Sequence, residues 1–213
     1  NPYSNAVNKI FMGGGGGAGH ENNANTATPG SNGGGIVIIK ANTLNGGGQT
    51  LNVQGGVTPT NSIDGGGGGG AGGSVLLSVT TYSDTLNINA SGSSGGSVSN
   101  VGTSNCNGPG GGGGGGILWV NQGSTPANIL LNNDGASSGT TIATSQSNCT
   151  VGSTNNALSE NNGATLSGLS LFESNCNTTP ITASTSICEQ DSIFLGGAWQ
   201  LTPGTYYDTV TSG

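Results

Sequence analysis

The sequence predicts an all-β fold: an elongated, repetitive domain, solenoid-like or a β-sandwich, with packed polyglycine runs of polyproline II type, followed by the start of a second small β module. Three observations lead to this prediction. Glycine supplies 45 of the 213 residues, about three times its average usage. Apolar residues make up 31% of the chain and charged residues 5%, against roughly 45–50% and 25% in typical soluble domains. No segment shows the periodicity of a helix, so an ordinary helical enzyme is not expected.

Short apolar strands follow directly after the glycine runs and form an internal repeat. First strands are expected at 36–39, 74–77 and 117–120, and second strands at 50–53, 85–88 and 129–132. Gly35, Gly73 and Gly116 mark the same position in the three units and are 38 and 43 residues apart. The repeat is therefore imperfect, and the units are expected to stack as similar layers.

The glycine runs at 13–17, 65–70 and 110–116 have two interpretations. They could be flexible linkers, because glycine-rich chains behave as random coils. They also recur in register before strands and contain almost no serine, which favours ordered segments. Ordering glycine is unfavourable by roughly 0.5–1 kcal/mol per residue relative to alanine, so an ordered run must gain something that only glycine allows. Close approach of backbones, with N–H and C=O groups bonding between neighbours, is that gain.

The end of the chain differs from the rest. Residues from about 140 to 180 contain less glycine and continue as β structure, with Leu166, Leu169 and Leu171 alternating toward a core. Pro180 then opens a different style of sequence. We therefore expect a glycine-rich β repeat domain at 1–180 and the beginning of a truncated β module at 181–213.

The four cysteines are disulfide candidates: Cys106, Cys149, Cys176 and Cys188. Cysteines in a chain rich in Asn, Ser, Thr and Gly favour disulfides and an oxidising compartment. A zinc site is the alternative, but the chain has no Cys-x-x-Cys pair and only one histidine, His20. The first three cysteines each end a Ser-Asn-Cys tripeptide, which suggests a repeated corner. The favoured pairs are Cys106 with Cys149 and Cys176 with Cys188.

The charge of the chain excludes one class of partner. Lys9 and Lys40 are the only basic residues apart from His20, arginine is absent, and the formal net charge is −7. Nucleic acids are not expected as partners, because proteins neutralise phosphates with clustered Lys and Arg. No membrane-spanning segment is expected either, since no apolar run approaches the roughly 20 residues that a transmembrane helix needs.

Residues for catalysis or metal binding are sparse. His20 beside Glu21 is the single imidazole–carboxylate pair, and a capping or turn role is favoured over catalysis. The other acids stand singly, so the paired carboxylates of a hydrolase are not evident. No cofactor is expected; calcium at Asp64 or Asp134 is the alternative, although Asp before Gly is usually turn chemistry. Trp119 alternates with Leu118 and Val120, so it is either an exposed platform for stacking sugars or a core residue, and the core is favoured.

Two stretches resemble a known family. Residues 12–56, from Met12 through the run at 13–17 and the strand at 36–39, resemble glycine-rich surface modules of very large secreted proteins of Bacteroidota-type bacteria. Residues 186–213 are similar to the start of tandem repeats in gliding-motility-associated adhesins of those bacteria, which the type IX secretion route exports. The positions that match there are Cys188, Asp191, Gly196, Gly197, Gly204, Tyr206 and Asp208.

This resemblance implies several further expectations. In the family a Gly-Cys-Asp-Ser segment follows, so the chain looks like a piece of a longer polypeptide, and Cys188 could pair with a later cysteine instead of Cys176. Such bacteria O-glycosylate Asp-Ser/Thr-apolar triplets, which makes Thr85, Ser192 and Thr209 candidate glycosylation sites.

The expected function is structural and adhesive, without catalysis: a segment of a secreted, extracellular protein of a bacterial cell surface or filament. Its partners would be surface glycans, neighbouring repeats or further copies along a filament. Two alternatives remain open. One is a carbohydrate- or ice-binding module, and the other is a polysaccharide-degrading enzyme on a β-helix.

Overall fold

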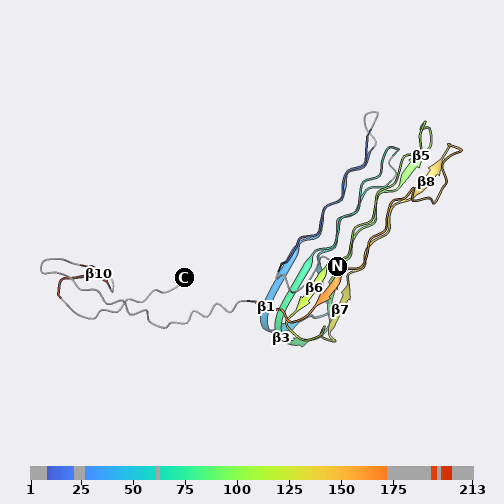
Figure 1. The fold of residues 1–213 in the computed structure, drawn as a ribbon. Helices are drawn as coiled ribbons and strands as arrows, with labels where there is room; N and C mark the ends of the chain where they lie inside the picture. Colours follow the sequence, from blue (N-terminus) through green and yellow to red (C-terminus); the bar gives the residue numbers. More distant parts are fainter. Residues whose placement is uncertain (1–8, 22–26, 61–62, 172–192, 196–197, 203–213) are drawn as a thin grey trace. The chain divides into compact units, whose positions relative to one another are not determined.

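The computed structural model describes residues 9–21, 27–60, 63–171, 193–195 and 198–202 (Figure 1). The chain divides into two compact units, Asn1–Leu171 and Phe172–Gly213. The described strands of the second unit are β10 (Ile193–Leu195) and β11 (Ala198–Gln200), which pair antiparallel. The predicted boundary near residue 180 lies outside the described residues, so the division into 1–180 and 181–213 stays a prediction.

The described strands of the first unit are parallel to their neighbours and form three separate sheets. They are β1 (Ile36–Asn45), β2 (Thr50–Asn52), β3 (Ser74–Ser83), β4 (Leu86–Asn89), β5 (Val98–Asn100), β6 (Ile117–Val120), β7 (Ile129–Asn132), β8 (Thr141–Thr144) and β9 (Ala164–Leu166). The sheet orders are β1-β3-β6-β9, β2-β4-β7 and β5-β8. Ile36 pairs with Ser74, and Ser74 with Ile117, which confirms the predicted repeat steps of 38 and 43 residues.

A thin hydrophobic core lies between the four-stranded and the three-stranded sheet. Val75, Leu77 and Leu118 reach it from one sheet and Ile88 from the other, and each is at most 1% exposed. Along β3 and β6 they alternate with residues on the opposite face of the sheet, where Leu76, Trp119 and Leu169 form a second buried cluster. Each repeat unit therefore adds only a few buried side chains to the core, which matches the low apolar content of the sequence.

Outside the strands, glycine-rich extended segments lie side by side and bond to one another through the backbone (Figure 1). The amides of Gly13, Gly16 and Gly19 donate to the carbonyls of Gly34, Ser31 and Thr28 at 2.8–2.9 Å. The amides of Gly66, Gly69 and Gly72 donate to the carbonyls of Gly108, Gly111 and Gly114, each at 2.9 Å. Bonds at every third residue match the three residues per turn of a polyproline II helix. These runs are therefore not flexible linkers.

The segments pack as a bundle that extends the two larger sheets. The segments at 28–35, 65–73, 108–116 and 157–163 run into β1, β3, β6 and β9, whereas those at 53–58, 90–97 and 133–140 leave β2, β4 and β7. Neighbouring segments therefore run in opposite directions when they belong to different layers. The segment at 65–73 exchanges backbone hydrogen bonds with both layers, so it lies inside the bundle.

Hydroxyl side chains occupy the interior of this bundle. Ser31, Thr58 and Ser93 are 8%, 4% and 6% exposed. The Ser31 Oγ lies 2.7 Å from the Thr58 Oγ1, and the Gly70 amide donates to the Oγ atoms of Ser31 and Ser93 at 2.8 and 3.0 Å. Buried polar groups stabilise a fold only when they are hydrogen-bonded, and here short hydroxyls bond the backbone that glycine leaves bare.

The prediction of an all-β solenoid or sandwich is wrong. The first unit contains several small parallel sheets, and much of its length is extended backbone outside any strand. The physical reason lies in glycine itself. A β-strand presents side chains on two faces, and a run without side chains has nothing to cover those faces. A helix with three residues per turn instead lets each residue bond a neighbour on a different side.

Candidate binding site at the distal loops

Loops at the end of the bundle away from the larger sheets carry the candidate site. We call the loop at 101–107, after β5, and the loop at 145–156, after β8, the distal loops. A disulfide joins them between Cys106 and Cys149, with a Cα–Cα distance of 5.7 Å. This confirms one predicted pair, whereas Cys176 and Cys188 lie outside the described residues. The disulfide joins two neighbouring repeat units of the first compact unit at the end of the bundle that the two larger sheets do not reach.

The loop at 101–107 is fixed by hydrogen bonds to one buried side chain. Asn100 is fully buried, and its Oδ1 accepts from the Asn107 amide at 2.8 Å while its Nδ2 donates to the Asn107 carbonyl at 3.2 Å. The Thr103 Oγ1 lies 2.8 Å from the Asn105 carbonyl oxygen. Gly102 turns the chain with a φ of 75°, a conformation that glycine adopts without strain. The loop therefore closes on itself around Asn100.

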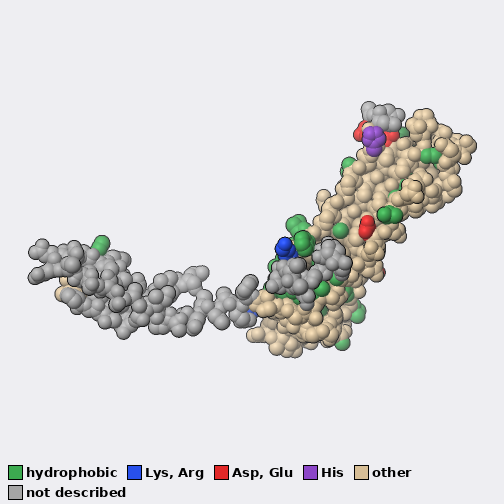
Figure 2. All heavy atoms as spheres, viewed as in Figure 1, with side chains coloured by type: hydrophobic (Ala, Val, Ile, Leu, Met, Phe, Trp, Pro, Cys, Tyr) green, Lys and Arg blue, Asp and Glu red, His purple; other side chains and the backbone are tan. Residues whose placement is uncertain are grey.

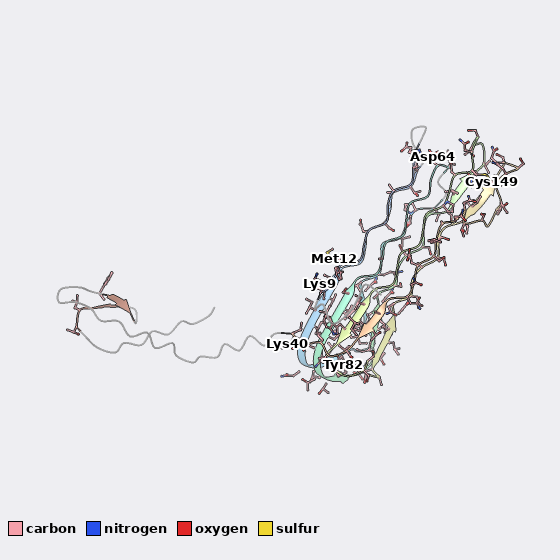
Figure 3. All side chains as sticks on the ribbon, viewed as in Figure 1. Lys9, Met12, Lys40, Asp64, Tyr82 and Cys149 are labelled. Carbon is pink, nitrogen blue, oxygen red and sulfur yellow. A yellow bond between two sulfur atoms is a disulfide. The ribbon has the colours of Figure 1, made fainter. Side chains whose placement is uncertain are left out.

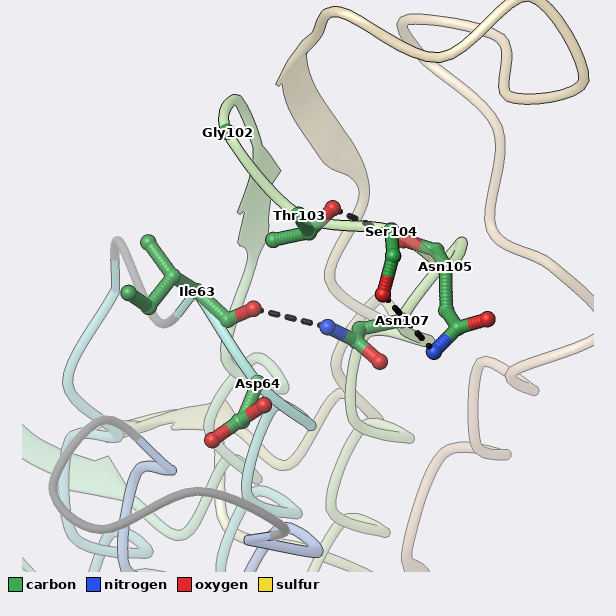
Figure 4. Close-up of a pocket in the computed structure, with 7 residues that line it drawn as sticks. All are labelled: Ile63, Asp64, Gly102, Thr103, Ser104, Asn105 and Asn107. Carbon is green, nitrogen blue, oxygen red and sulfur yellow. Dashed lines mark hydrogen bonds between the residues drawn. The ribbon is translucent and has the colours of Figure 1, made fainter.

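A pocket of about 210 Å³ lies between this loop and the turn before the segment at 65–73 (Figure 4). It is lined by Ile63, Asp64, Gly102, Thr103, Ser104, Asn105 and Asn107. The Asn107 Nδ2 donates to the Ile63 carbonyl at 2.7 Å and so bridges the two sides. Figure 4 shows the side chains of Ser104, Asn105 and Asn107 converging, whereas the Ile63 side chain points away. The pocket wall is therefore polar.

Charge is distributed unevenly along the bundle. The lining residues include one carboxylate, Asp64, which is 4% exposed, and no cationic side chain. Figure 3 shows Lys9 and Lys40 toward the end with the larger sheets, far from Asp64 and Cys149. These are the only lysines of the chain, and it has no arginine. An anionic ligand would find no lysine or arginine beside this pocket.

Trp119 and Thr85, two other residues that the sequence analysis singled out, do not line this pocket. Trp119 is 5% exposed, packs with Leu76 and Leu169, and donates its Nε1 hydrogen to the Ser167 carbonyl at 3.1 Å. The interpretation of Trp119 as an exposed sugar platform is therefore wrong, and the core interpretation is right. Thr85 is exposed and stays a candidate for glycosylation.

The remaining candidates are Ser192 and Thr209 for glycosylation, the pair His20 and Glu21, and Asp64 and Asp134 for calcium. Ser192 and Thr209 lie outside the described residues. His20 and Glu21 are both exposed. Within the described part of the chain, no three His, Cys, Asp or Glu residues come together as metal ligands would. The calcium alternative at Asp64 and Asp134 therefore has no such ligand set among these residues.

Sequence reasoning missed Asn100, Asn107 and the pocket that they shape. A signal was present: Asp64 and Asn107 are 43 residues apart, the same step that separates Gly73 from Gly116. The pocket therefore lies between equivalent turn positions of neighbouring repeat units. Cys106 and Cys149 are separated by the same 43 residues.

No family model, curated protein or solved structure matches the chain. Among the described residues, no helix is long and apolar enough to cross a membrane. Function must therefore be argued from the bundle and its distal loops.

Proposed function

We propose that this chain is a structural and adhesive segment of a secreted protein on a bacterial cell surface or in an extracellular filament. The observation that carries the proposal is a bundle held by backbone hydrogen bonds, with disulfide-linked loops at its end. Such a bundle is a rigid support whose loops are free to contact a surface. Loops on a rigid scaffold are the usual place for binding functions.

Composition and chemistry support this proposal. The surface in Figure 2 is mostly backbone and polar side chains, with few hydrophobic or charged groups among the described residues. A disulfide in a small, loop-bearing unit is typical of proteins outside the reducing cytosol. The resemblance of residues 12–56 and 186–213 to gliding-motility-associated adhesins supports a bacterial cell surface and export by the type IX route. Surface glycans, or further copies of the chain along a filament, are the proposed partners.

Adhesion can be tested with beads that carry the complete 213-residue chain. The beads are passed under flow over agarose, chitin and mucin surfaces, with albumin-coated beads as the reference. We expect stronger retention on at least one polysaccharide-bearing surface, and weaker retention after the disulfide is reduced and alkylated. If the coated beads are retained no better than albumin beads on all three surfaces, the adhesive function is wrong.

A further inference from the structure

We propose that the distal pocket binds one neutral saccharide unit through its hydroxyl groups. This inference rests on the proposed adhesive function and names the site and the ligand class. The pocket has a volume of about 210 Å³ and is partly open to solvent. It is smaller than the roughly 300–1,000 Å³ of pockets for drug-sized ligands. Its size suits a single sugar ring at the end of a glycan.

The lining chemistry matches a ligand that both donates and accepts hydrogen bonds. Ser104 offers a hydroxyl, and Asn105 and Asn107 offer amides. Sugar hydroxyls can donate to the amide oxygens and accept from the amide nitrogens and the serine. The single apolar residue of the lining, Ile63, turns its side chain away (Figure 4). An apolar ligand would therefore meet a polar wall and leave it unsatisfied.

The site is held in place before any ligand arrives. Asn107 is fixed at both ends, because its amide donates to the Asn100 Oδ1 and its Nδ2 donates to the Ile63 carbonyl. The disulfide between Cys106 and Cys149 adds a covalent link beside it. A preorganised site loses less entropy on binding, which matters for a weak ligand such as one sugar.

Electrostatics selects a neutral sugar over an acidic one. The carboxylate of Asp64 is 4% exposed, and the chain has a formal net charge of −7. The lining offers no cation to pair with a uronic or sialic acid. A like charge beside a shielded carboxylate is unfavourable, because screening by solvent is reduced there.

The test is an amide NMR titration of the complete chain. The probes are the methyl glycosides of glucose, galactose, mannose and N-acetylglucosamine, with glucuronic and sialic acid as charged counterparts. At about 50 mM sugar, a site with a millimolar dissociation constant is nearly saturated. We expect at least one neutral sugar to shift the amides of residues 102–107, and both acidic sugars to bind more weakly. The inference is wrong if no neutral sugar shifts these amides, or if the acidic sugars bind equally well.

Ser104→Trp and Ser147→Trp form a matched pair of variants. Both serines are exposed and open a Ser-Asn-Cys tripeptide at the two arms of the same disulfide, but only Ser104 lines the pocket. We expect Ser104→Trp to weaken the sugar at least about tenfold, or about 1.4 kcal/mol, and Ser147→Trp to leave it unchanged. Equal affinity for both variants would overturn the inference, and unchanged melting temperatures would show that both fold.

Asp64→Asn tests the carboxylate, with Asp134→Asn as the control for charge, since Asp134 is exposed and outside the pocket lining. We expect Asp64→Asn to narrow the preference for neutral over acidic sugars, and Asp134→Asn to leave it unchanged. If the two variants show the same preference as the wild type, Asp64 does not select the ligand. If coated beads are retained but no sugar shifts the amides of residues 102–107, the saccharide site is wrong and the adhesive function stands. If a sugar shifts these amides but the beads are not retained, the adhesive function is wrong and the saccharide site stands.

Discussion

Replacing Gly113 by alanine tests whether backbone contact holds the bundle together. Gly113 lies inside the segment at 108–116. A β-carbon added there would be 2.0 Å from the Gly70 carbonyl oxygen and 2.4 Å from its carbon. Real β-carbons do not approach a neighbour closer than 3.0 Å, so the two segments must move apart by about 1 Å. The neighbour is backbone and cannot rotate away as a flexible side chain could.

The expected loss of stability follows from the bonds that this movement breaks. Between the two segments, the Gly69 amide donates to the Gly111 carbonyl and the Gly72 amide donates to the Gly114 carbonyl, both at 2.9 Å. Losing them removes about 1 kcal/mol each, and overpacking adds roughly 1–3 kcal/mol. Alanine also lowers the conformational entropy of the unfolded chain, which stabilises the folded variant by about 0.4–1 kcal/mol. We expect a net loss of about 2–5 kcal/mol, which lowers the melting temperature by roughly 10 °C in a chain of this size.

The next residue supplies the control. A β-carbon on Gly114 would meet nothing nearer than the Asn161 carbonyl oxygen at 3.9 Å, so Gly114→Ala should be neutral or stabilise by about 0.4–1 kcal/mol. Thermal unfolding followed by circular dichroism, and guanidinium unfolding followed by fluorescence of the buried Trp119, measure both variants. If Gly113→Ala and Gly114→Ala have the same stability, the close-packed bundle is wrong.

Three further predictions concern stability. Reducing the disulfide between Cys106 and Cys149, which closes a loop of 43 residues, should lower the free energy of unfolding by about 4 kcal/mol; an unchanged melting temperature in reductant would contradict this. Ser93→Ala should destabilise by about 1–3 kcal/mol, because it removes a donor to the Gly56 carbonyl and an acceptor for the Gly70 amide, whereas alanine at the exposed Ser94 should change little in the same denaturation assay. Burial raises the pKa of Tyr82 above its ordinary 10.0, with the Gln122 side chain partly opposing this. The Tyr82 hydroxyl therefore ionises at a lower pH in the unfolded chain than in the folded one. Its contribution to the free energy of unfolding is constant below about pH 10 and falls as the pH rises further. In urea unfolding at a series of pH values, the free energy of unfolding of Tyr82→Phe should fall less steeply above about pH 10 than that of the wild type. The same steepness in both proteins would contradict the raised pKa of Tyr82.

The sequence allowed the strands to be located and predicted that the glycine runs pack as polyproline II segments, but it did not indicate which segments are neighbours. Strands such as β3 and β6 were predictable, because apolar residues follow a glycine at a fixed position and repeat after 43 residues. A run of identical residues shows no periodicity, so the sequence at 110–116 does not reveal that every third residue contacts the same neighbouring segment. The error of expecting a solenoid or sandwich follows from this, since alternation was visible only in the strands.

Part of the pattern was still present where glycine gives way to other residues. Thr28 and Ser31 are three residues apart, both are buried, and each accepts a hydrogen bond from the amide of a glycine on the segment at 65–73. The same spacing places Gly34 next in the row, with its amide on the Ala71 carbonyl. A search for hydroxyl residues at intervals of three would have indicated which positions of the predicted polyproline II segments face the interior. The distal pocket needed the repeat step as well, because Asp64 and Asn107 are equivalent positions in neighbouring units.

A backbone-packed bundle also restricts where a chain of this kind can carry specificity. In the segment at 108–116, added β-carbons on Gly110, Gly112, Gly113, Gly115 and Gly116 would all lie within 2.1 Å of a neighbouring carbonyl oxygen. Substitutions at these glycines would lower the stability of the fold, so this segment cannot vary in sequence to bind a ligand. By contrast, Ser104 and Asn105 in the distal loop are exposed, and the loop is held by Asn100 and the disulfide instead of by glycine contacts. Substitutions can therefore accumulate in the distal loops without loss of the bundle, and this separation of support from contact surface suits the proposed adhesive function.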